Sequence, residues 1–139
     1  MVHSDPHPPE VLEILRRRSK ATRIAVVGAS NDPAKYGNVI VKNLAAKGYT
    51  VLPVNPKEKE IAGLPAYPDL ASVPGPVHIV DVVTPPAVTR GILEEAARLG
   101  LAAVWLQDGS YDAAALAVAA KAPYETVYDA CIMVASNFG

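Results

Sequence analysis

The chain has 139 residues, of which half are hydrophobic and 19% are charged, with a formal net charge of -1 and one cysteine. This composition predicts one globular domain, and it excludes a disordered chain, a disulfide scaffold and a protein that binds nucleic acid through bulk positive charge. No apolar run is long enough to span a membrane and no signal-peptide core is visible, so we expect a cytoplasmic domain. The 13 prolines are more than the usual share of about 5%, and they mark where strands and helices end.

The N-terminal segment is polar and rich in proline. We therefore expect residues 1–8 to be flexible and residues 9–139 to form the single domain. A helix is predicted from Glu10 to Lys20, because its apolar residues recur at helical spacing. The basic run from Arg16 to Lys20 falls in the last turns, where positive charge suits the helix dipole, and is interpreted as a solvated helix end.

From Arg23 onward, short apolar runs rich in β-branched residues alternate with helical stretches. Such runs are typical of strands that are buried on both faces. The predicted strands are Ile24–Val27, Val51–Val54, Ile79–Val83, Ala103–Leu106 and Thr126–Tyr128, and the predicted helices between them are Gly37–Lys47, Pro86–Leu99 and Asp112–Lys121. This alternation indicates a parallel sheet with right-handed crossovers. The expected fold is α/β, a Rossmann-like, doubly wound, mostly parallel five-stranded sheet with an extra N-terminal helix.

Proline interrupts this pattern in two places. The segment from Lys57 to Pro76 is broken into short pieces, and only Asp69–Val73 has room for a helical turn. Pro53 lies inside a predicted strand but lacks the N–H group that strand pairing uses. We therefore expect that strand to bulge at Pro53 or to end its pairing early.

The turn after the first strand of the sheet is the strongest functional signal. In doubly wound folds, ligands bind beyond the carboxyl ends of the strands, and phosphates favour the start of the next helix. Gly28 would permit a sharp turn, and Gly37 would let a ligand approach the helix. Ser30 offers a hydroxyl group and Lys35 a positive charge. The turn predicts a phosphate-binding loop, and the alternative is a pair of turn glycines in a fold that has lost its ligand.

This loop does not match the dinucleotide fingerprint G-x-G-x-x-G. The second and third glycines of that motif would stand at Ser30 and Pro33, and Lys57 follows the second strand where an acidic residue is expected. A lysine suits a phosphorylated ribose better than a free ribose diol. An NAD(P)-binding redox sensor or reductase remains an alternative, as does an interaction module with a vestigial pocket.

Several motifs occur together in the order in which a known protein family has them. They are Ile24–Ser30, Lys35–Gly37, Gly48–Lys57, Ile61–Leu70, Val80–Val83, Val104–Gln107 and Asp129–Val134. With these motifs, residues 14–135 resemble the small stand-alone CoA-binding proteins, which are similar to the CoA-binding domain of the succinyl-CoA synthetase α subunit and of NDP-forming acyl-CoA synthetases.

The resemblance implies that coenzyme A, or a short acyl-CoA, binds at the carboxyl ends of the strands. By their position in the motifs, the implied binding residues are Gly28, Ala29, Ser30, Lys35, Tyr36 and Gly37 around the phosphates; Asn55, Pro56 and Lys57 near the adenosine 3′-phosphate; Val83, Thr84 and Pro85 beside the ligand after the third strand; Gln107, Asp108 and Gly109 along the pantetheine arm; and Cys131 near the thiol. The chain departs from many relatives after Val82, where they carry an aromatic and a basic residue, and at Ala130, where a basic residue often stands. Both departures weaken the transfer of charged contacts.

No catalytic constellation is visible in the sequence. The related synthetases use a phosphohistidine in a separate domain, and none of His3, His7 and His78 matches such a position. There is no Ser-His-Asp or Cys-His arrangement and no metal-ligand spacing. We therefore expect a non-catalytic carrier, sensor or accessory protein whose partner is a small molecule, with no nucleic-acid or membrane partner. A homodimer or a synthetase partner subunit is compatible with the sequence.

Three side chains have alternative interpretations. Asp81 lies in an apolar strand and is interpreted as a structural carboxylate bound to loop amides or a lysine, with a perturbed acid at the ligand site as the alternative. Cys131 is interpreted as a small buried hydrophobic residue, with a mixed disulfide to CoA as the alternative. Tyr36 would either stack on an adenine ring or pack over the loop.

Overall fold

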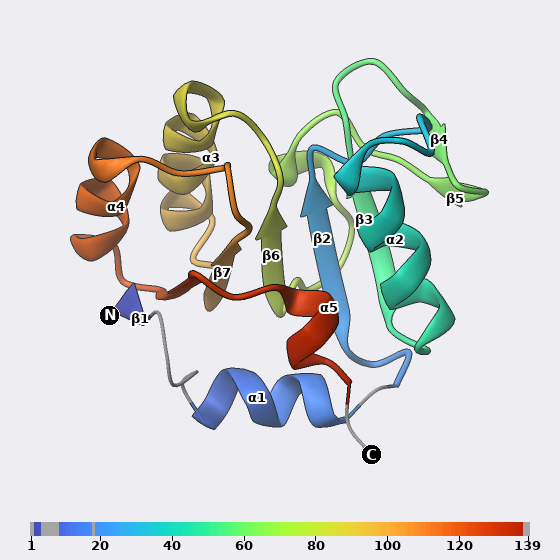
Figure 1. The fold of residues 1–139 in the computed structure, drawn as a ribbon, viewed down its shortest axis with the longest axis horizontal. Helices are drawn as coiled ribbons and strands as arrows, with labels where there is room; N and C mark the ends of the chain where they lie inside the picture. Colours follow the sequence, from blue (N-terminus) through green and yellow to red (C-terminus); the bar gives the residue numbers. More distant parts are fainter. Residues whose placement is uncertain (1, 4–8, 18, 138–139) are drawn as a thin grey trace.

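The computed structural model describes residues 2–3, 9–17 and 19–137. Its core is a parallel sheet with the strand order β1-β8-β7-β6-β2-β3 (Figure 1). The strands are β1 (Val2–His3), β2 (Arg23–Val27), β3 (Thr50–Val54), β6 (Ile79–Val82), β7 (Ala103–Leu106) and β8 (Glu125–Tyr128). All except the two-residue β1 correspond to the apolar runs, so the predicted Rossmann-like sheet of five parallel strands is confirmed.

The helices between the strands also agree with their predicted bounds to within one residue. The helical elements are α1 (Pro9–Arg16), α2 (Tyr36–Ala46), α3 (Pro86–Arg98), α4 (Ala113–Ala120), α5 (Ile132–Ala135) and the 3-10 turn η1 (Leu70–Ser72). The short helix α5 was not predicted, whereas η1 lies within the expected helical turn. The carboxylate of Asp112 accepts a hydrogen bond from the N–H of Ala115, which caps α4.

The two ends of the N-terminal region differ from the predictions. Helix α1 ends at Arg16 rather than Lys20, because the hydroxyl of Ser19 accepts a hydrogen bond from the N–H of Ala21 and turns the chain toward β2. Val2–His3 forms a strand that was not predicted and pairs with β8, and the expected flexibility of residues 1–8 remains a prediction. Residues 1 and 4–8 lie outside the described part of the chain.

Helices cover both faces of the sheet, because successive residues of a strand point to opposite sides. On one face α1, α2 and α5 pack over Ile24, Val26 and Trp105. On the other face α3, α4 and η1 pack over Ala25 and Val80. Strands buried on both sides account for the apolar runs in the sequence.

The strand order places a topological switch point between β2 and β6. From β2 the chain passes to β3 on one side, and it later returns as β6 on the other side. The loops that leave the two strands therefore diverge at their carboxyl ends, where open α/β sheets bind ligands. The N–H of Val83 donates to the carbonyl of Val27 at 2.8 Å and holds these ends together.

A small hairpin next to β3 was not predicted. Its strands β4 (Glu60–Ile61) and β5 (Leu64–Pro65) are antiparallel, and the buried side chain of Ile61 anchors it to the core. The nearby β3 is the edge strand of the sheet, which explains why it accommodates Pro53 without a bulge.

Candidate functional site

The turn after β2 requires glycine at its first position. Gly28 has a φ of 96°, which is a left-handed conformation that disfavours a side chain. A Cβ atom there would lie 2.9 Å from the carbonyl carbon of Val83. Gly28 therefore lets the loops after β2 and β6 approach closely at the switch point.

Gly37 allows close packing between helix α2 and the loop after β2. It is buried at the start of α2, and a Cβ atom there would collide with the carbonyl oxygen of Gly28. The glycine at this position is therefore explained by packing, and the approach of a ligand to Gly37 remains a prediction. Its small size lets α2 pack directly against the turn.

Asparagine side chains hold the loop from residue 28 to residue 36. The side-chain amide of Asn38 donates to the carbonyl of Ser30 at 2.9 Å, and that of Asn55 donates to the carbonyl of Ala29 at 2.9 Å. The amide of Asn31 donates to the carbonyl of Glu60 at 2.8 Å, which ties the loop to the β4-β5 hairpin. Hydrogen bonds within the protein thus hold the loop in place.

A cavity of about 300 Å³ opens beside this loop at the switch point, at the lower end of the size range of small-molecule sites. Among the predicted site residues, those that line it are Gly28, Ala29, Ser30, Lys35, Asn55, Pro56 and Thr84. Residues that the sequence patterns did not identify also line it, namely Val27, Val54, Pro68, Asp69, Leu70, Val88, Ile92 and Glu95.

One face of α3 forms a long wall of this cavity. Val88, Ile92 and Glu95 follow one another at helical spacing, and Leu70 of η1 lines the cavity with them. Val88 is 53% exposed although it is apolar. The helical spacing of Val88, Ile92 and Glu95 is the only sequence signal that could have pointed to this wall.

The charges and donors of the cavity suit a phosphorylated ligand near the loop. Lys35 supplies a positive charge among the lining residues. The hydroxyl of Ser30 accepts a hydrogen bond from the N–H of Asp32 at 3.0 Å, which leaves the hydroxyl proton available for an acceptor. Asp69 and Glu95 bring negative charge to the part bounded by η1 and α3.

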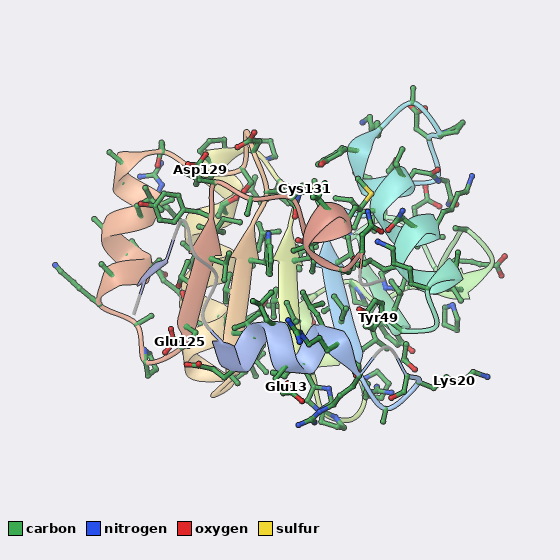
Figure 2. The ribbon with its side chains drawn as sticks, turned by 60° about the horizontal axis from the view of Figure 1, so that its bottom comes forward. Glu13, Lys20, Tyr49, Glu125, Asp129 and Cys131 are labelled. Atoms are coloured by element: carbon green, nitrogen blue, oxygen red, sulfur yellow. The ribbon has the colours of Figure 1, made fainter. Side chains whose placement is uncertain are left out.

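A second cavity of about 200 Å³ contains the cysteine. Its lining residues are Tyr36, Gln107, Asp108, Asp129, Ala130 and Cys131. Four of the predicted site residues, from distant parts of the chain, meet in it: Tyr36, Gln107, Asp108 and Cys131. Figure 2 shows Cys131 at the start of α5 and Asp129 at the same edge of the sheet.

Hydrogen bonds connect Tyr36, Gln107 and Cys131. The hydroxyl oxygen of Tyr36 lies 2.8 Å from the sulfur of Cys131, and the amide of Gln107 donates to that hydroxyl at 3.4 Å. The carbonyl of the Gln107 side chain accepts from the N–H of Ile132 at 3.0 Å. Gln107 is only 1% exposed, so it holds both Tyr36 and the start of α5 in place.

The surroundings of the sulfur favour a thiolate. Burial alone would raise the pKa of the Cys131 thiol, but hydrogen bonds from Tyr36, the backbone N–H groups of Val134 and Met133, and Gln107 outweigh it and lower this pKa. Burial and the contact with Cys131 raise the pKa of Tyr36, which keeps its hydroxyl protonated as a donor. The interpretation of Cys131 as a buried hydrophobic residue is therefore wrong. The hydroxyl of Tyr36 contacts this sulfur, a role that neither stacking on adenine nor packing over the loop included.

Asp81 is an acid that no described residue binds. It is fully buried, and neither carboxylate oxygen has a hydrogen-bond partner among the described residues. Burial, and next the charge of Cys131, raises its pKa well above the ordinary value. The interpretation of Asp81 as a carboxylate bound to amides or a lysine is wrong, and the alternative of a perturbed acid at the ligand site remains a prediction.

Asp81 lies on the side of the sheet that carries the second cavity. Its neighbour on β7 is Trp105, whose indole N–H donates to the carbonyl of Ala130 at 2.9 Å. Ala130 directly precedes Cys131 and lines the cavity. The carboxyl group thus belongs to the layer beneath the thiol.

The remaining predicted residues line neither cavity. Lys57 is exposed next to Pro56, and its N–H donates to the side-chain oxygen of Asn55 at 2.8 Å. Val83 is partly buried against the core, Pro85 precedes α3, and Gly109 occupies a turn with a φ of 84°. Their contact with a ligand remains a prediction.

The described residues contain no cluster of three or more histidine, cysteine, aspartate or glutamate side chains that could hold a metal ion. None of their helices has the length and apolar character needed to cross a membrane.

Residues 22–137 match the CoA binding domain family, and the chain belongs to this family. The resemblance seen in the sequence motifs is therefore confirmed. A relative of nearly equal length is the uncharacterized protein YneT of Bacillus subtilis, which is 32% identical over 131 residues, covering 94% of this chain and 95% of YneT. A hypothetical protein from Pyrococcus horikoshii has a similar structure, with a TM-score of 0.83 and 35% identity over 96% of this chain and 92% of the other.

Larger proteins contain a related region. The ADP-forming acetate–CoA ligase I of Archaeoglobus fulgidus is 41% identical over 75 residues, which are 54% of this chain but 11% of the ligase. The similarity thus concerns a small part of that protein.

Proposed function

We propose that this protein binds coenzyme A, or a short acyl-CoA, across the carboxyl end of its sheet and acts as a carrier, sensor or accessory protein without catalysing a reaction. The observation that carries the proposal is the pair of cavities at this end of the sheet. One is an apolar-walled space next to a phosphate-binding type of loop, and the other contains a thiol. CoA has a nucleotide at one end and a thiol at the other.

The proposed orientation follows from these cavities. The nucleotide half lies between α3 and η1, and its phosphates lie near Ser30 and Lys35. The pantetheine arm passes over the start of α2 toward Gln107. Lys57 lies next to the first cavity and would contact the 3′-phosphate at the surface. Family membership supports this orientation.

The wider role follows from the relatives. The ligases contain a related region within a longer chain, so a synthetase-type partner subunit is one arrangement for this protein, and a homodimer is another. We place the protein in the cytoplasm, where thiols remain reduced.

A thermal-shift titration in reducing buffer tests the proposal, with CoA, acetyl-CoA, NAD and NADP as ligands. A ligand present at 100 times its dissociation constant adds about 2.7 kcal/mol to the free energy of unfolding. We expect CoA to raise the melting temperature and the dinucleotides to have no effect. A shift with NADP and none with millimolar CoA would reverse the assignment.

Lys35 and Lys42 form a matched pair for the phosphate contact. Both lie on the surface at or near α2, but only Lys35 lines the first cavity. We expect Lys35→Ala to weaken CoA binding about tenfold, the effect of losing one charge-assisted hydrogen bond of about 1.4 kcal/mol. Lys42→Ala should leave the dissociation constant unchanged. Equal losses in a calorimetric titration would mean that Lys35 acts only through the net charge.

A further inference from the structure

Cys131 stands in a cavity built around its sulfur. The hydroxyl of Tyr36 contacts the sulfur at 2.8 Å, and Gln107 holds this hydroxyl on one side and the N–H of Ile132 on the other. Cys131 is partly exposed and lines a space of about 200 Å³. A cysteine that only filled the core would need neither the donors nor the open space.

Asp81 is a second, independent feature of the same place. A fully buried carboxyl group without a hydrogen-bond partner among the described residues costs stability. Asp81 pairs with Val26 and Trp105 on the neighbouring strands, so it lies on the sheet face covered by α2 and α5, the side of the thiol. An apolar side chain would serve packing better at this position, which indicates that the cavity is adapted to a reactive or polar occupant.

We propose that Cys131 is a thiol–disulfide exchange site at which the protein captures CoA from CoA disulfide as a mixed disulfide. This inference rests on the proposed function, because the bound nucleotide half delivers the disulfide to the sulfur. It makes the protein a stoichiometric sensor of oxidised CoA.

The exchange balances without a further oxidant or reductant. Cys131 loses its proton to solvent, and its thiolate attacks one sulfur of CoA disulfide. The bond between the two CoA sulfurs breaks as the bond from the Cys131 sulfur forms, and the second CoA leaves as a thiolate that takes up a proton from solvent. One disulfide is consumed and one is made, so reduced CoA in excess reverses the step.

Tyr36 has a defined part in this step as a positioning residue. Its hydroxyl donates to the sulfur and favours the thiolate, while the other ionisable groups near the sulfur, Asp81, Asp108 and Asp129, are acidic. Tyr36→Phe removes the donor and keeps the ring, so it raises the pKa of the thiol. For each pKa unit of that rise, exchange near neutral pH should slow about threefold. The loss is less than tenfold because the thiolate that remains is a stronger nucleophile. Above both pKa values the variant should be as fast as the wild type or faster.

The decisive experiment treats the reduced full chain with CoA disulfide and measures its intact mass over time. We expect one adduct per chain, with the mass of CoA less two hydrogens, which dithiothreitol removes. Cys131→Ser should give no adduct while retaining the wild-type melting temperature. Glutathione disulfide, at the same concentration, should react at least tenfold more slowly, because it lacks the nucleotide half.

Adenosine 3′,5′-bisphosphate separates this inference from the proposed function. It should block the adduct with CoA disulfide and leave the reaction with glutathione disulfide unchanged. If reduced CoA binds but no adduct forms, or if Tyr36→Phe leaves the pH profile of exchange unchanged, the exchange site is refuted and the proposed function stands. If both disulfides react equally and the bisphosphate has no effect, Cys131 is merely a reactive thiol, and both proposals fail.

Discussion

Asp81 shows at the scale of one residue how a buried acid affects the protein. Because burial raises its pKa, the folded chain keeps a proton on this carboxyl group at pH values where the unfolded chain has lost it. The unfolded carboxyl group ionises near pH 3.9. The contribution of Asp81 to folding stability therefore falls as the pH rises from that value toward the pKa of the folded state.

Replacement of Asp81 by asparagine removes this pH dependence. Asparagine has nearly the same shape and no proton to lose, so the free energy of unfolding of Asp81→Asn, relative to the wild type, should increase steadily between pH 4 and pH 8. Urea unfolding at a series of pH values measures the difference. A difference that stays constant over this range would mean that the carboxyl group is already ionised in the folded protein.

Gly28 and Gly91 allow a matched test of the turn at the switch point. Gly28→Ala places a side chain at a positive φ and against Val83, and it should lower the free energy of unfolding by roughly 1–3 kcal/mol. Gly91 lies within α3 with open space around it, so Gly91→Ala should raise the free energy by about 0.5–1 kcal/mol. Chemical denaturation of both variants checks the opposite signs, and a neutral Gly28→Ala would show that the turn relaxes easily.

At the scale of elements, α3 packs against the core with one face and lines the first cavity with another. Leu93 and Ala96 bury one face of this helix against the sheet, while Val88, Ile92 and Glu95 face the first cavity. The second set lies at the start of the helix and along one side, next to η1. A ligand in the cavity would therefore bind to a helix that the core already holds in place.

Substitution of Val88 tests whether this wall of the first cavity contacts the ligand, and substitution of Leu99 is the control. Both are exposed apolar residues at the ends of α3, but only Val88 lines the cavity. Val88→Ser removes apolar contact worth about 1 kcal/mol, so the dissociation constant for CoA should rise about fivefold. Leu99→Ser should leave it unchanged. Titration calorimetry measures both, and an unchanged Val88→Ser would place the nucleotide elsewhere.

The helices and strands that could be predicted are those whose own residues carry the signal, as an apolar pattern or a helix cap. Strands such as Ala103–Leu106 are apolar on both faces, and α4 begins at a capping aspartate, so sequence alone defines them. The β4-β5 hairpin has two-residue strands, which leave no periodic pattern. Its turn has positive φ at Ala62 and Gly63, and only the second of these is a residue that signals such a turn.

The candidate site could be predicted only where it follows a strand. Gln107 comes directly after β7, and Ser30 lies three residues after β2, so the topology alone brings them to the ligand edge. Glu95 reaches the first cavity through the packing of α3 against η1, and the contact between Tyr36 and Cys131 joins segments 95 residues apart. Such contacts depend on tertiary packing, for which a single sequence carries no periodic signal.

At the scale of the whole molecule, the sheet separates the two cavities. The first cavity has walls from η1 and α3, which cover one face of the sheet, and the second has walls from the start of α2 and from Cys131, on the side of the other face. A single ligand can reach both only by crossing the carboxyl ends of β2 and β6. A long flexible molecule with different ends fits this arrangement better than a compact one.

The separation predicts that the two halves of CoA bind independently. Adenosine 3′,5′-bisphosphate and pantetheine should each bind weakly and without competing, and CoA should bind at least a hundredfold more tightly than either, because its link makes the second contact intramolecular. Competition measured by ligand-observed NMR checks this. Mutual displacement of the two fragments would show that they share one cavity.

The side-chain amide of Asn31 makes the hydrogen bonds of a neighbouring strand between the binding loop and the β4-β5 hairpin. It donates to the carbonyl of Glu60 and accepts from the N–H of Ala62 at 3.1 Å, as a neighbouring backbone would. The N–H of Ala62 therefore cannot exchange its hydrogen with water until its hydrogen bond to Asn31 breaks and the loop separates from the hairpin. The rate at which this one amide takes up deuterium thus reports how often the loop opens.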